Sequence, residues 1–298
     1  MKSKPVLLYF DDEAPSAKRI AQAGNMDLVA IEIHRFPDNE FKLQLPATLS
    51  EHVVILRTLN NPNEKLIELL LAAQTARELG ARHLTLVAPY LPYMRQDVAF
   101  HPGEAISQRI VGRFLAGLFN AVITVDPHLH RVATLQEAVP VATAMVISGA
   151  LLLSDLIATR RKNPLLVGPD EESAQWVTLA AARNGFDHAV CRKVRHGDRA
   201  VEVKLPAVAV TGRHVVLLDD VASTGNTVAQ AARLLLTAGA ASVDVAVTHA
   251  LFAGNALQMM RDAGVGEVWS TDCISHPSNS VSMALPIAHA LAQINIAD

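Results

Sequence analysis

The chain has 298 residues, half of them hydrophobic and 18% charged, which gives room for about two domains and argues against disorder. The net charge of −3 provides no overall positive field for nucleic-acid binding, and the two cysteines form neither a metal-binding nor a disulfide pattern. No apolar run approaches the roughly 18 residues of a membrane span, and Asp11, Asp12 and Glu13 cut the N-terminal apolar run too early for a signal peptide. We therefore expect a cytoplasmic protein that binds neither nucleic acid nor membrane.

The first half of the chain alternates short apolar runs, typical of buried strands, with longer stretches of helical pattern. We expect strands over residues 6–10, 28–33, 53–56, 84–88 and 122–125, and helices over residues 63–79 and 104–118. Strands that alternate with helices in this way predict a parallel sheet with right-handed crossovers.

The second half repeats the alternation. We expect strands over residues 165–167, 189–191, 215–218, 243–248 and 268–270, and helices over residues 173–183, 227–238 and 256–263. The pattern predicts an α/β protein with two similar halves that divide near residues 141–148. The last helical stretch, 287–294, is expected to pack back on the first half.

The stretch 215–227 carries the strongest functional signal. A predicted buried strand ends in two carboxylates, and a turn of small polar residues precedes the next helix. Such a turn offers backbone N–H groups and a favourable helix dipole to a phosphate, whereas the carboxylates would repel it and suit sugar hydroxyls or Mg²⁺. An ordinary strand–loop–helix turn is the alternative. We interpret the pattern as a ribose 5-phosphate site formed by Asp219, Asp220, Ser223, Thr224, Gly225, Asn226 and Thr227.

Polar residues also follow four other predicted strands, at the end where open α/β sheets bind ligands. They are Arg95, Gln96 and Asp97, then Asp126 and His128, then Asp170, and finally Lys193 and Arg195. Their positions predict that His128 and Asp170 bind Mg²⁺, since no third His or Cys has a spacing that suits Zn²⁺. His130 is expected to be structural.

Two further segments have a functional and an ordinary interpretation. The cationic segment 193–199 is either a solvated loop or a mobile loop that places Lys193 and Arg195 on a polyphosphate. Residues 35–40 form either a simple hairpin turn or a purine contact, in which Phe36 stacks on the base and Asp38 or Glu40 accepts from an exocyclic amine.

Together these segments resemble the ribose-phosphate pyrophosphokinase family, also called phosphoribosyl pyrophosphate (PRPP) synthetases. The resemblance runs through nearly the whole chain and rests on motifs in order at residues 35–40, 89–97, 126–128, 169–170, 193–203 and 219–227. The family transfers the β,γ-diphosphoryl group of ATP to the 1-hydroxyl of ribose 5-phosphate, which gives PRPP and AMP. Its fold is two tandem type I phosphoribosyltransferase-like domains, each a mostly parallel sheet flanked by helices. The resemblance implies domains over residues 1–145 and 146–282, with residues 283–298 packed on the first.

The resemblance also implies roles for individual residues. It makes Lys193 and Arg195 catalytic, gives the metal role to His128 and Asp170, and places ribose 5-phosphate on Asp219, Asp220 and residues 223–227. Asp38 and Glu40 resemble adenine contacts that reach into a neighbouring subunit's site, which implies a homo-oligomer of two or more subunits. The remaining implied ATP contacts are Phe36, Asn39, Arg95, Gln96 and Asp97.

The chain departs from the family pattern at a few positions. Val194 replaces the middle cation of the catalytic segment, and Asn39 and Asn226 stand where a Gly is usual, although Asn tolerates left-handed backbone. The Ser-Thr start of the phosphate turn resembles the shorter archaeal-type members. Two alternatives stay open: a non-catalytic regulatory homologue, and a phosphoribosyltransferase that consumes PRPP.

Overall fold

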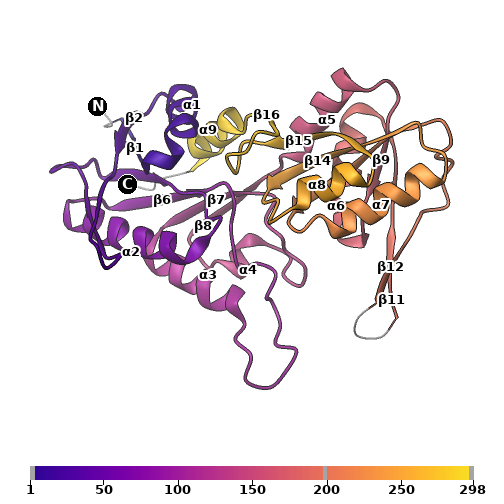
Figure 1. Cartoon of the computed structure of the whole chain (residues 1–298). Helices are drawn as coiled ribbons and strands as arrows, with labels where there is room; N and C mark the ends of the chain where they lie inside the picture. Colours follow the sequence, from indigo (N-terminus) through magenta and orange to yellow (C-terminus); the bar gives the residue numbers. More distant parts are fainter. Residues whose placement is uncertain (1–3, 197–199, 295–298) are drawn as a thin grey trace. The chain divides into compact units, whose positions relative to one another are not determined.

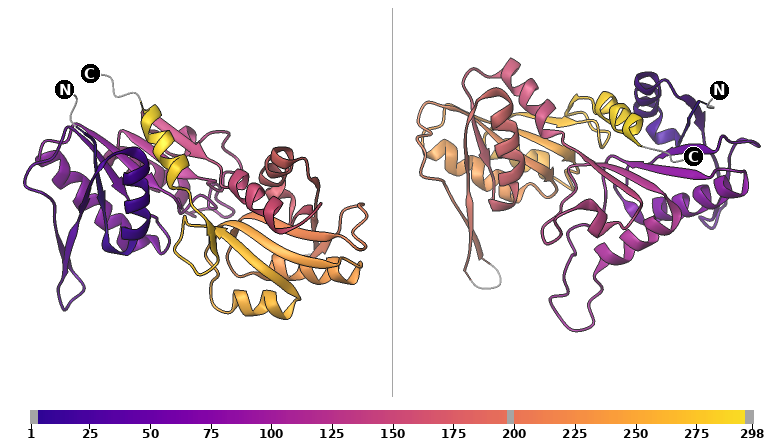
Figure 2. Two further views of the ribbon diagram at one scale, coloured as in Figure 1. Left: turned by 90° about the horizontal axis from the view of Figure 1, so that it is seen from above. Right: turned by 180° about the vertical axis from the view of Figure 1, so that it is seen from behind.

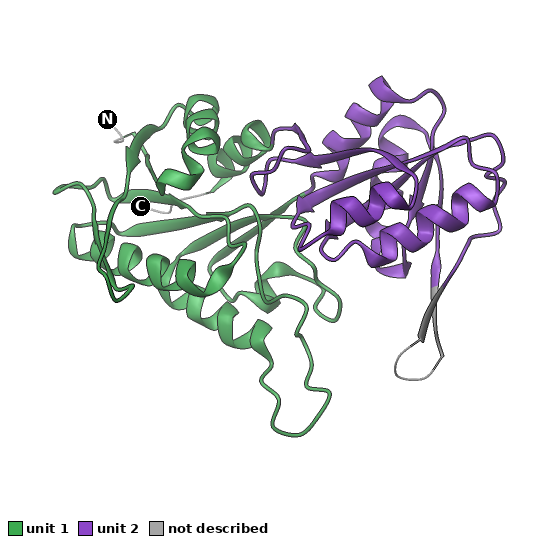
Figure 3. Cartoon of the chain, in the orientation of Figure 1, with its two compact units in different colours: residues 1–147, 283–298 green, residues 148–282 purple. Residues whose placement is uncertain are grey.

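The computed structural model describes residues 4–196 and 200–294, and it leaves the side chains of residues 193–202 outside the description. The chain divides into two compact units, shown in Figure 3. Unit 1 comprises Met1–Ile147 and Met283–Asp298, and unit 2 comprises Ser148–Ser282. The C-terminal helix α9 (Ala284–Gln293) therefore returns to the unit that contains the N-terminus.

Unit 1 is built on a six-stranded parallel sheet with the order β2-β1-β5-β6-β7-β8. Helices α1 and α9 contact each other on one face, and helices α2 and α3 lie on the other (Figures 1 and 2). Both faces of the sheet are thus covered, which is why every residue of β7 is buried. The strands are β1 (Val6–Tyr9), β2 (Asp27–Ala30), β5 (His52–Leu56), β6 (His83–Ala88), β7 (Ala121–Val125) and β8 (Thr143–Ile147). The helices are α1 (Ala14–Gly24), α2 (Pro62–Glu78), α3 (Ser107–Leu118) and the short α4 (Leu135–Ala138).

A separate two-stranded antiparallel sheet belongs to unit 1. It pairs β3 (Glu32–Arg35) with β4 (Phe41–Gln44). The expected single strand over residues 28–33 was therefore wrong, because the chain leaves the parallel sheet after Ala30. The Ile31 N–H still donates to the Tyr9 carbonyl at 2.8 Å, but the next four residues pair only with β4.

Unit 2 has a second six-stranded parallel sheet, ordered β10-β9-β13-β14-β15-β16. Alternate residues of its central strand β13 supply two cores: Val215 and Leu217 pack with residues of α7 and α8, and Val216 and Leu218 pack with α5 and α6. The strands are β9 (Leu165–Gly168), β10 (Asp187–Val190), β13 (His214–Ala222), β14 (Ser242–Ala250), β15 (Val265–Thr271) and β16 (Asn279–Val281). The helices are α5 (Ala150–Arg160), α6 (Ala174–Asn184), α7 (Asn226–Thr237) and α8 (Ala256–Asp262).

Several elements were not anticipated from the sequence. Helix α1 has only modest apolar content, although Pro15 in its first turn and the left-handed Asn25 at its C-cap are recognisable start and stop signals. Strand β8 lies where we expected only a boundary between the halves, and helix α5, directly after it, was not expected. A two-stranded hairpin of β11 (Arg192–His196) and β12 (Ala200–Lys204) replaces the expected loop.

Candidate active site

The predicted phosphate turn lies between β13 and α7 in unit 2. Gly225 precedes the helix in left-handed backbone, with φ of +76°, and an added Cβ would lie 3.2 Å from the Ala256 carbonyl oxygen. The left-handed backbone therefore favours glycine, and a side chain would also crowd Ala256. Asn226 is the first residue of α7 and has no positive φ, so its tolerance of left-handed backbone is not used at this position.

The turn is held from one side and open on the other. The carbonyls of Ala222 and Ser223 accept hydrogen bonds from the N–H groups of Phe252 and Ala253, each at 2.9 Å. Thr224 and Asn226 are exposed. The first N–H groups of an α-helix have no acceptor within the helix, so the start of α7 offers donors and a positive dipole end to an anion. This arrangement fits a phosphate.

Acidic residues gather next to this turn. Asp219 is half-buried, whereas Asp220 and Asp170 are buried, and Asp219 Oδ1 accepts a hydrogen bond from the Asp220 N–H at 2.9 Å. Burial raises the pKa of Asp219 well above its ordinary value, and the charges of Asp220 and Asp170 raise it further. Among the described residues no cation contributes to this shift. A ligand that brings positive charge or hydroxyl donors next to Asp219 would therefore favour its ionised form.

The positions of these acids differ slightly from the prediction. Strand β13 continues to Ala222, so Asp219 and Asp220 lie within the strand, near its carboxyl end, rather than beyond it. Asp219 is paired in register with Val247 of β14. Asp170 follows β9, the hydrogen-bonded neighbour of β13, and its carboxylate caps a short 3₁₀ turn by accepting from the Glu172 N–H at 3.1 Å. Adjacent parallel strands thus bring Asp170 and Asp219 to the same edge.

The predicted catalytic cations lie on β11. In the antiparallel pairing, Lys193 is opposite Val203 and Arg195 is opposite Val201. The segment is thus strand rather than loop, and the alternation of cations with Val194, continued by Val201 and Val203, was a recognisable strand signal. The side chains of Lys193 and Arg195 lie outside the described part of the chain, as does all of Gly197.

In unit 1 the stretch 36–40 is the turn of the β3–β4 hairpin. The Phe36 N–H donates to the Glu40 carbonyl at 2.8 Å, and the Glu40 N–H donates to Asp38 Oδ1 at 3.2 Å. Asn39 has φ of +70°, which confirms the left-handed backbone expected there. The Phe36 ring is 41% exposed, and Asp38 and Glu40 are exposed as well. The turn therefore presents an aromatic face beside two carboxylates.

The segment after β6 divides into an exposed cation and a buried acid. Arg95 is exposed and makes no ion pair with the residues that the structure describes. The Gln96 side chain donates to the Val98 carbonyl at 3.1 Å. Asp97 is buried and forms an ion pair with Arg131 at 2.5 Å. Arg95 is thus available to a ligand, whereas the Asp97 carboxylate is engaged within unit 1.

His128 follows β7 and has a neighbour that the sequence interpretation set aside. His128 Nε2 and His130 Nε2 are 2.6 Å apart, and the two rings meet edge to face with centroids 4.3 Å apart. The buried Asp126 just before them has φ of +36°, an unusual conformation for a residue with a side chain. The two-residue spacing of the histidines at a strand exit was the signal for this pair.

A buried charged network at the same edge of unit 1 was missed entirely. Arg57 follows β5 and is 4% exposed, and it is flanked by Glu13 and Glu68, which are 6% and 2% exposed. Burial alone would lower the pKa of Arg57, but the charges of Glu13 and Glu68 raise it. Burial raises the pKa of Glu13 to about 7 although Arg57 acts in the opposite direction. The available signal was a charged residue directly after the apolar run 53–56, and another within the run 66–71.

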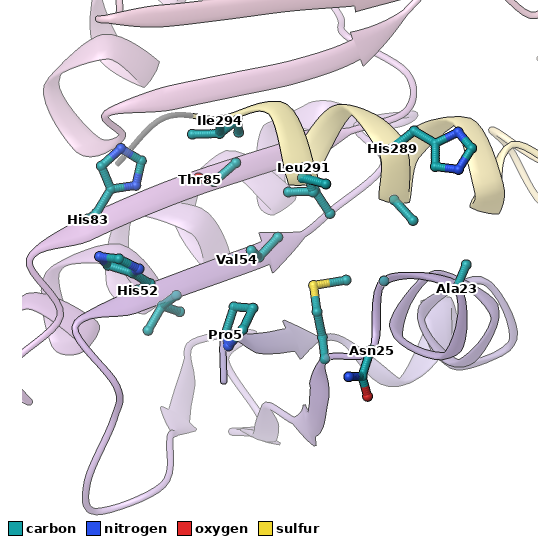
Figure 4. Close-up of a pocket in the computed structure, with 15 residues that line it drawn as sticks. Pro5, Ala23, Asn25, His52, Val54, His83, Thr85, His289, Leu291 and Ile294 are labelled. Carbon is teal, nitrogen blue, oxygen red and sulfur yellow. The ribbon is translucent and has the colours of Figure 1, made fainter. Parts of the chain in front are cut away.

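A pocket of about 420 Å³ lies elsewhere in unit 1 (Figure 4). It is formed by α1, α9 and the start of β5 and β6, and its lining includes His52, His83, Thr85 and Ile294. Burial lowers the pKa of His83, and the neighbouring His52 and Arg77 lower it further. This is the amino end of the sheet, and none of the sequence-predicted site residues lines the pocket.

Within the described residues, no helix has both the length and the apolar character to traverse a bilayer.

Comparisons with known proteins agree with the motifs. The family model for the N-terminal domain of ribose phosphate pyrophosphokinase matches residues 6–118, and the phosphoribosyl transferase domain model matches residues 137–286. A ribose-phosphate pyrophosphokinase of Methanopyrus kandleri is 33% identical over 97% of this chain and 99% of its own length. Ribose-phosphate pyrophosphokinase 1 of Archaeoglobus fulgidus is 35% identical over 96% of this chain and 100% of its own.

A solved structure shares the fold. The crystal structure of phosphoribosylpyrophosphate synthetase from Mycobacterium smegmatis matches with a TM-score of 0.82 and covers 97% of this chain and 98% of its own, at 23% sequence identity. The two tandem domains with parallel sheets, expected from the motifs, are thus confirmed. On the matches of both family models and of nearly full-length relatives above 30% identity, the chain belongs to the ribose-phosphate pyrophosphokinase family.

Proposed function

We propose that this chain makes PRPP and AMP from ATP and ribose 5-phosphate by Mg²⁺-dependent diphosphoryl transfer. The observation that carries the proposal is the pairing, within unit 2, of an acidic strand end with an open helix N-terminus. Asp219 lies on β13, and the Gly225 turn that follows the same strand begins α7. A ligand that satisfies both must have hydroxyls at one end and a phosphate at the other, as ribose 5-phosphate does.

Ribose 5-phosphate would bind along this strand and turn. The 5-phosphate accepts hydrogen bonds from the turn 223–227, where Ser223, Thr224 and Thr227 add hydroxyls to the backbone N–H groups of α7. Asp219 and Asp220 accept from the vicinal ribose hydroxyls, which directs the 1-hydroxyl away from the phosphate turn. Such hydrogen bonds to a charged acceptor are worth about 1.5–3 kcal/mol.

ATP would contact the carboxyl-edge segments of unit 1. Phe36 offers a face for the purine, and Asp38, Asn39 and Glu40 offer polar contacts to its edge. Arg95, with Gln96 beside it, is the candidate for the ATP phosphates, supported by its exposure. The Asp97 carboxylate would fix this segment through its ion pair with Arg131 rather than contact the nucleotide itself.

The residues present fit a magnesium ion. Burial and neighbouring acids raise the pKa of Asp219, so a divalent cation beside Asp170 would favour the ionised form of these carboxylates. We assign the metal role to Asp170 and His128. When bound, Mg²⁺ would supply positive charge that neutralises the phosphates. The expected result is that ATP tightens Mg²⁺ binding and that His128→Ala weakens it in a calorimetric titration; a titration equal to the parent's would remove His128 from the site.

Lys193 and Arg195 complete the proposed chemistry. As the ribose 1-oxygen attacks the β-phosphorus, negative charge shifts to the oxygen that leaves with AMP. Cations placed at that point stabilise the transition state more than the bound substrates. The pairing of β11 with β12 gives both residues a strand scaffold.

We also propose that the chain is a homo-oligomer of at least two subunits. The exposure of Phe36, Asp38 and Glu40 supports this, because the turn presents its side chains outward. If the turn completes a neighbour's site, mixing an Asp38/Glu40 double variant with a Lys193 variant should restore some activity. A lack of recovery after demonstrated subunit exchange would contradict the shared site.

One assay tests the proposed reaction against its alternatives. The chain is incubated with ATP, ribose 5-phosphate and Mg²⁺, and AMP and PRPP are quantified. A regulatory homologue would release no AMP, and a phosphoribosyltransferase would consume added PRPP with a base instead of forming it. Formation of both products only when ribose 5-phosphate is present would exclude both alternatives.

A further inference from the structure

Arg57 is the centre of the buried network in unit 1. Its guanidinium contacts Asp12 Oδ1 at 2.5 Å and Glu13 Oε1 at 3.4 Å, it forms a close ion pair with Glu68, and it lies 4.3 Å above the centre of the Phe10 ring. A guanidinium buried to this extent is fixed by its neighbours, because any departure would leave their charges uncompensated. Arg57 therefore provides a rigid point at the end of β5.

Glu68 extends this network outward. One carboxylate oxygen, Oε2, pairs with Arg57, and the other, Oε1, lies 3.5 Å from Arg35 Nη2. Arg35 also pairs with Glu64, one turn earlier on α2, and its side chain is 49% exposed. The single carboxylate of Glu68 thus joins a buried cation to a half-exposed one.

Arg35 is the last residue of β3, directly before the turn 36–40. The hairpin that carries this turn is not hydrogen-bonded into the six-stranded sheet. Ile33 and Leu43 pack partly against the core and so hold the base of the hairpin. At the turn end, Arg35 forms ion pairs with α2, and β4 of the hairpin also contacts α2.

We propose that Glu68, held by Arg57, is a positioning residue that orients the β3–β4 hairpin through Arg35 and thereby sets the turn 36–40 for nucleotide binding. The inference rests on the proposed nucleotide role of that turn. Glu68 is only 2% exposed and acts through Arg35. Its effect should therefore fall on ATP, whereas ribose 5-phosphate, assigned to unit 2, should bind as before.

The kinetic test compares Glu68→Gln and Arg35→Gln with the parent chain. Each should raise the KM for ATP roughly two- to thirtyfold, the range typical of residues that couple to a site through others, while the KM for ribose 5-phosphate stays unchanged. The double variant should be no worse than the more affected single variant, because both break the same link. Additive effects on the KM for ATP would contradict a shared link.

A matched control uses another ion pair of unit 1. Glu51→Gln breaks the exposed pair with Arg82 and should leave the KM for ATP near the parent value. Because Glu68→Gln disturbs a buried pair, Arg35→Gln, which changes a half-exposed side chain, keeps the test valid if Glu68→Gln folds poorly.

Hydrogen exchange gives a readout that does not depend on catalysis. In Arg35→Gln and Glu68→Gln, backbone amides of residues 33–41 should exchange faster than in the parent, while those of β5 and β6 keep their protection. Unchanged exchange in the hairpin would overturn the positioning role. Faster exchange with an unchanged KM for ATP would overturn the link to nucleotide binding. Failure of the proposed function itself would appear separately, as a parent chain that forms no AMP.

Discussion

The carboxyl edges of the two sheets differ in how their charged side chains are paired. In unit 1, cations pair with buried acids: the buried Arg57 lies among Glu13 and Glu68, and the exposed Arg131 pairs with Asp97. In unit 2, Asp219 lies beside other acids, and both of the neighbouring charges that act on it raise its pKa. The described charges at the first edge are neutralised in pairs, whereas the neighbouring acids at the second raise the pKa of Asp219, which a bound metal ion or sugar hydroxyl would lower.

The paired charges around Arg57 and the acids around Asp219 differ in what they can offer a ligand. Charges that are neutralised within the chain fix geometry and have little left to offer a ligand. Carboxylates held together at the cost of stability are typical of sites where function outweighs stability. Substitution of Arg57 should therefore act mainly on stability, and substitution of Asp219 mainly on substrate kinetics.

The largest expected effect is on stability, from Arg57→Met. The variant leaves two buried carboxylates without their cation, which should lower the free energy of unfolding by about 3–5 kcal/mol. Urea denaturation measures this change. The control is Arg82→Met, whose exposed pair with Glu51 should matter by no more than about 0.5 kcal/mol. A stability loss of similar size in both variants would mean that the buried network has no special role.

The next effect is on catalysis, from Lys193→Ala in unit 2. If Lys193 stabilises the charge that develops on the leaving oxygen, kcat should fall at least ~10²-fold, the typical cost of removing one transition-state donor. The KM values should change little, because the interaction is made mostly in the transition state. Steady-state kinetics with both substrates provide the measurement. A kcat close to that of the parent would refute the proposed role and favour the regulatory alternative.

Asp219→Asn should separate stability from function. Removing a charge that burial and neighbouring acids disfavour should raise the melting temperature above pH 7, in contrast to Arg57→Met. The same change should raise the KM for ribose 5-phosphate by a factor equivalent to about 1.5–3 kcal/mol, the worth of a charged hydrogen-bond acceptor. A variant with lower stability and an unchanged KM would place Asp219 among the structural residues instead.

The effect that is smallest per pH unit is a pH dependence from Glu13. Its pKa is about 7 in the folded chain against an ordinary 4.5, so the folded state binds the proton more tightly than the unfolded state. Stability from this group is therefore complete below pH 4.5 and is lost as the pH rises towards 7, with a slope of at most about 1.4 kcal/mol per pH unit. Glu13→Gln should remove this contribution. The parent-minus-variant difference in unfolding free energy between pH 5 and pH 8 tests the sign, and an increase with pH would contradict it.

The sequence was most informative where local pattern and function coincide. The apolar run before Asp219 and the polar turn after it predicted the strand–turn–helix unit, and the pattern around Asn39 predicted a hairpin turn with left-handed backbone. In both cases the residues that determine the backbone are neighbours in the chain, so one short segment contains the whole signal.

The rest depended on contacts between distant segments. Arg57 and Glu13 are 44 positions apart, and nothing in either segment alone shows that the two side chains are buried against each other. The strand expected over residues 28–33 failed for a related reason, since departure from the sheet after Ala30 is set by the hairpin that follows. The 193–199 segment was expected as a loop because its charges and glycine outweighed the alternation of cations with Val194. The pairing of β11 with β12 shows that this alternation belongs to a strand.

The most direct measurement is the dependence of AMP formation from ATP on ribose 5-phosphate, in the presence of Mg²⁺. The paired acids and phosphate turn of unit 2 predict that AMP and PRPP appear in equal amounts and only when ribose 5-phosphate is present. They also predict that Asp219→Asn raises the KM for the sugar phosphate, so that this variant needs a higher concentration of ribose 5-phosphate to reach half of its maximal rate. AMP formation that does not require ribose 5-phosphate, or none under any condition, would contradict the account.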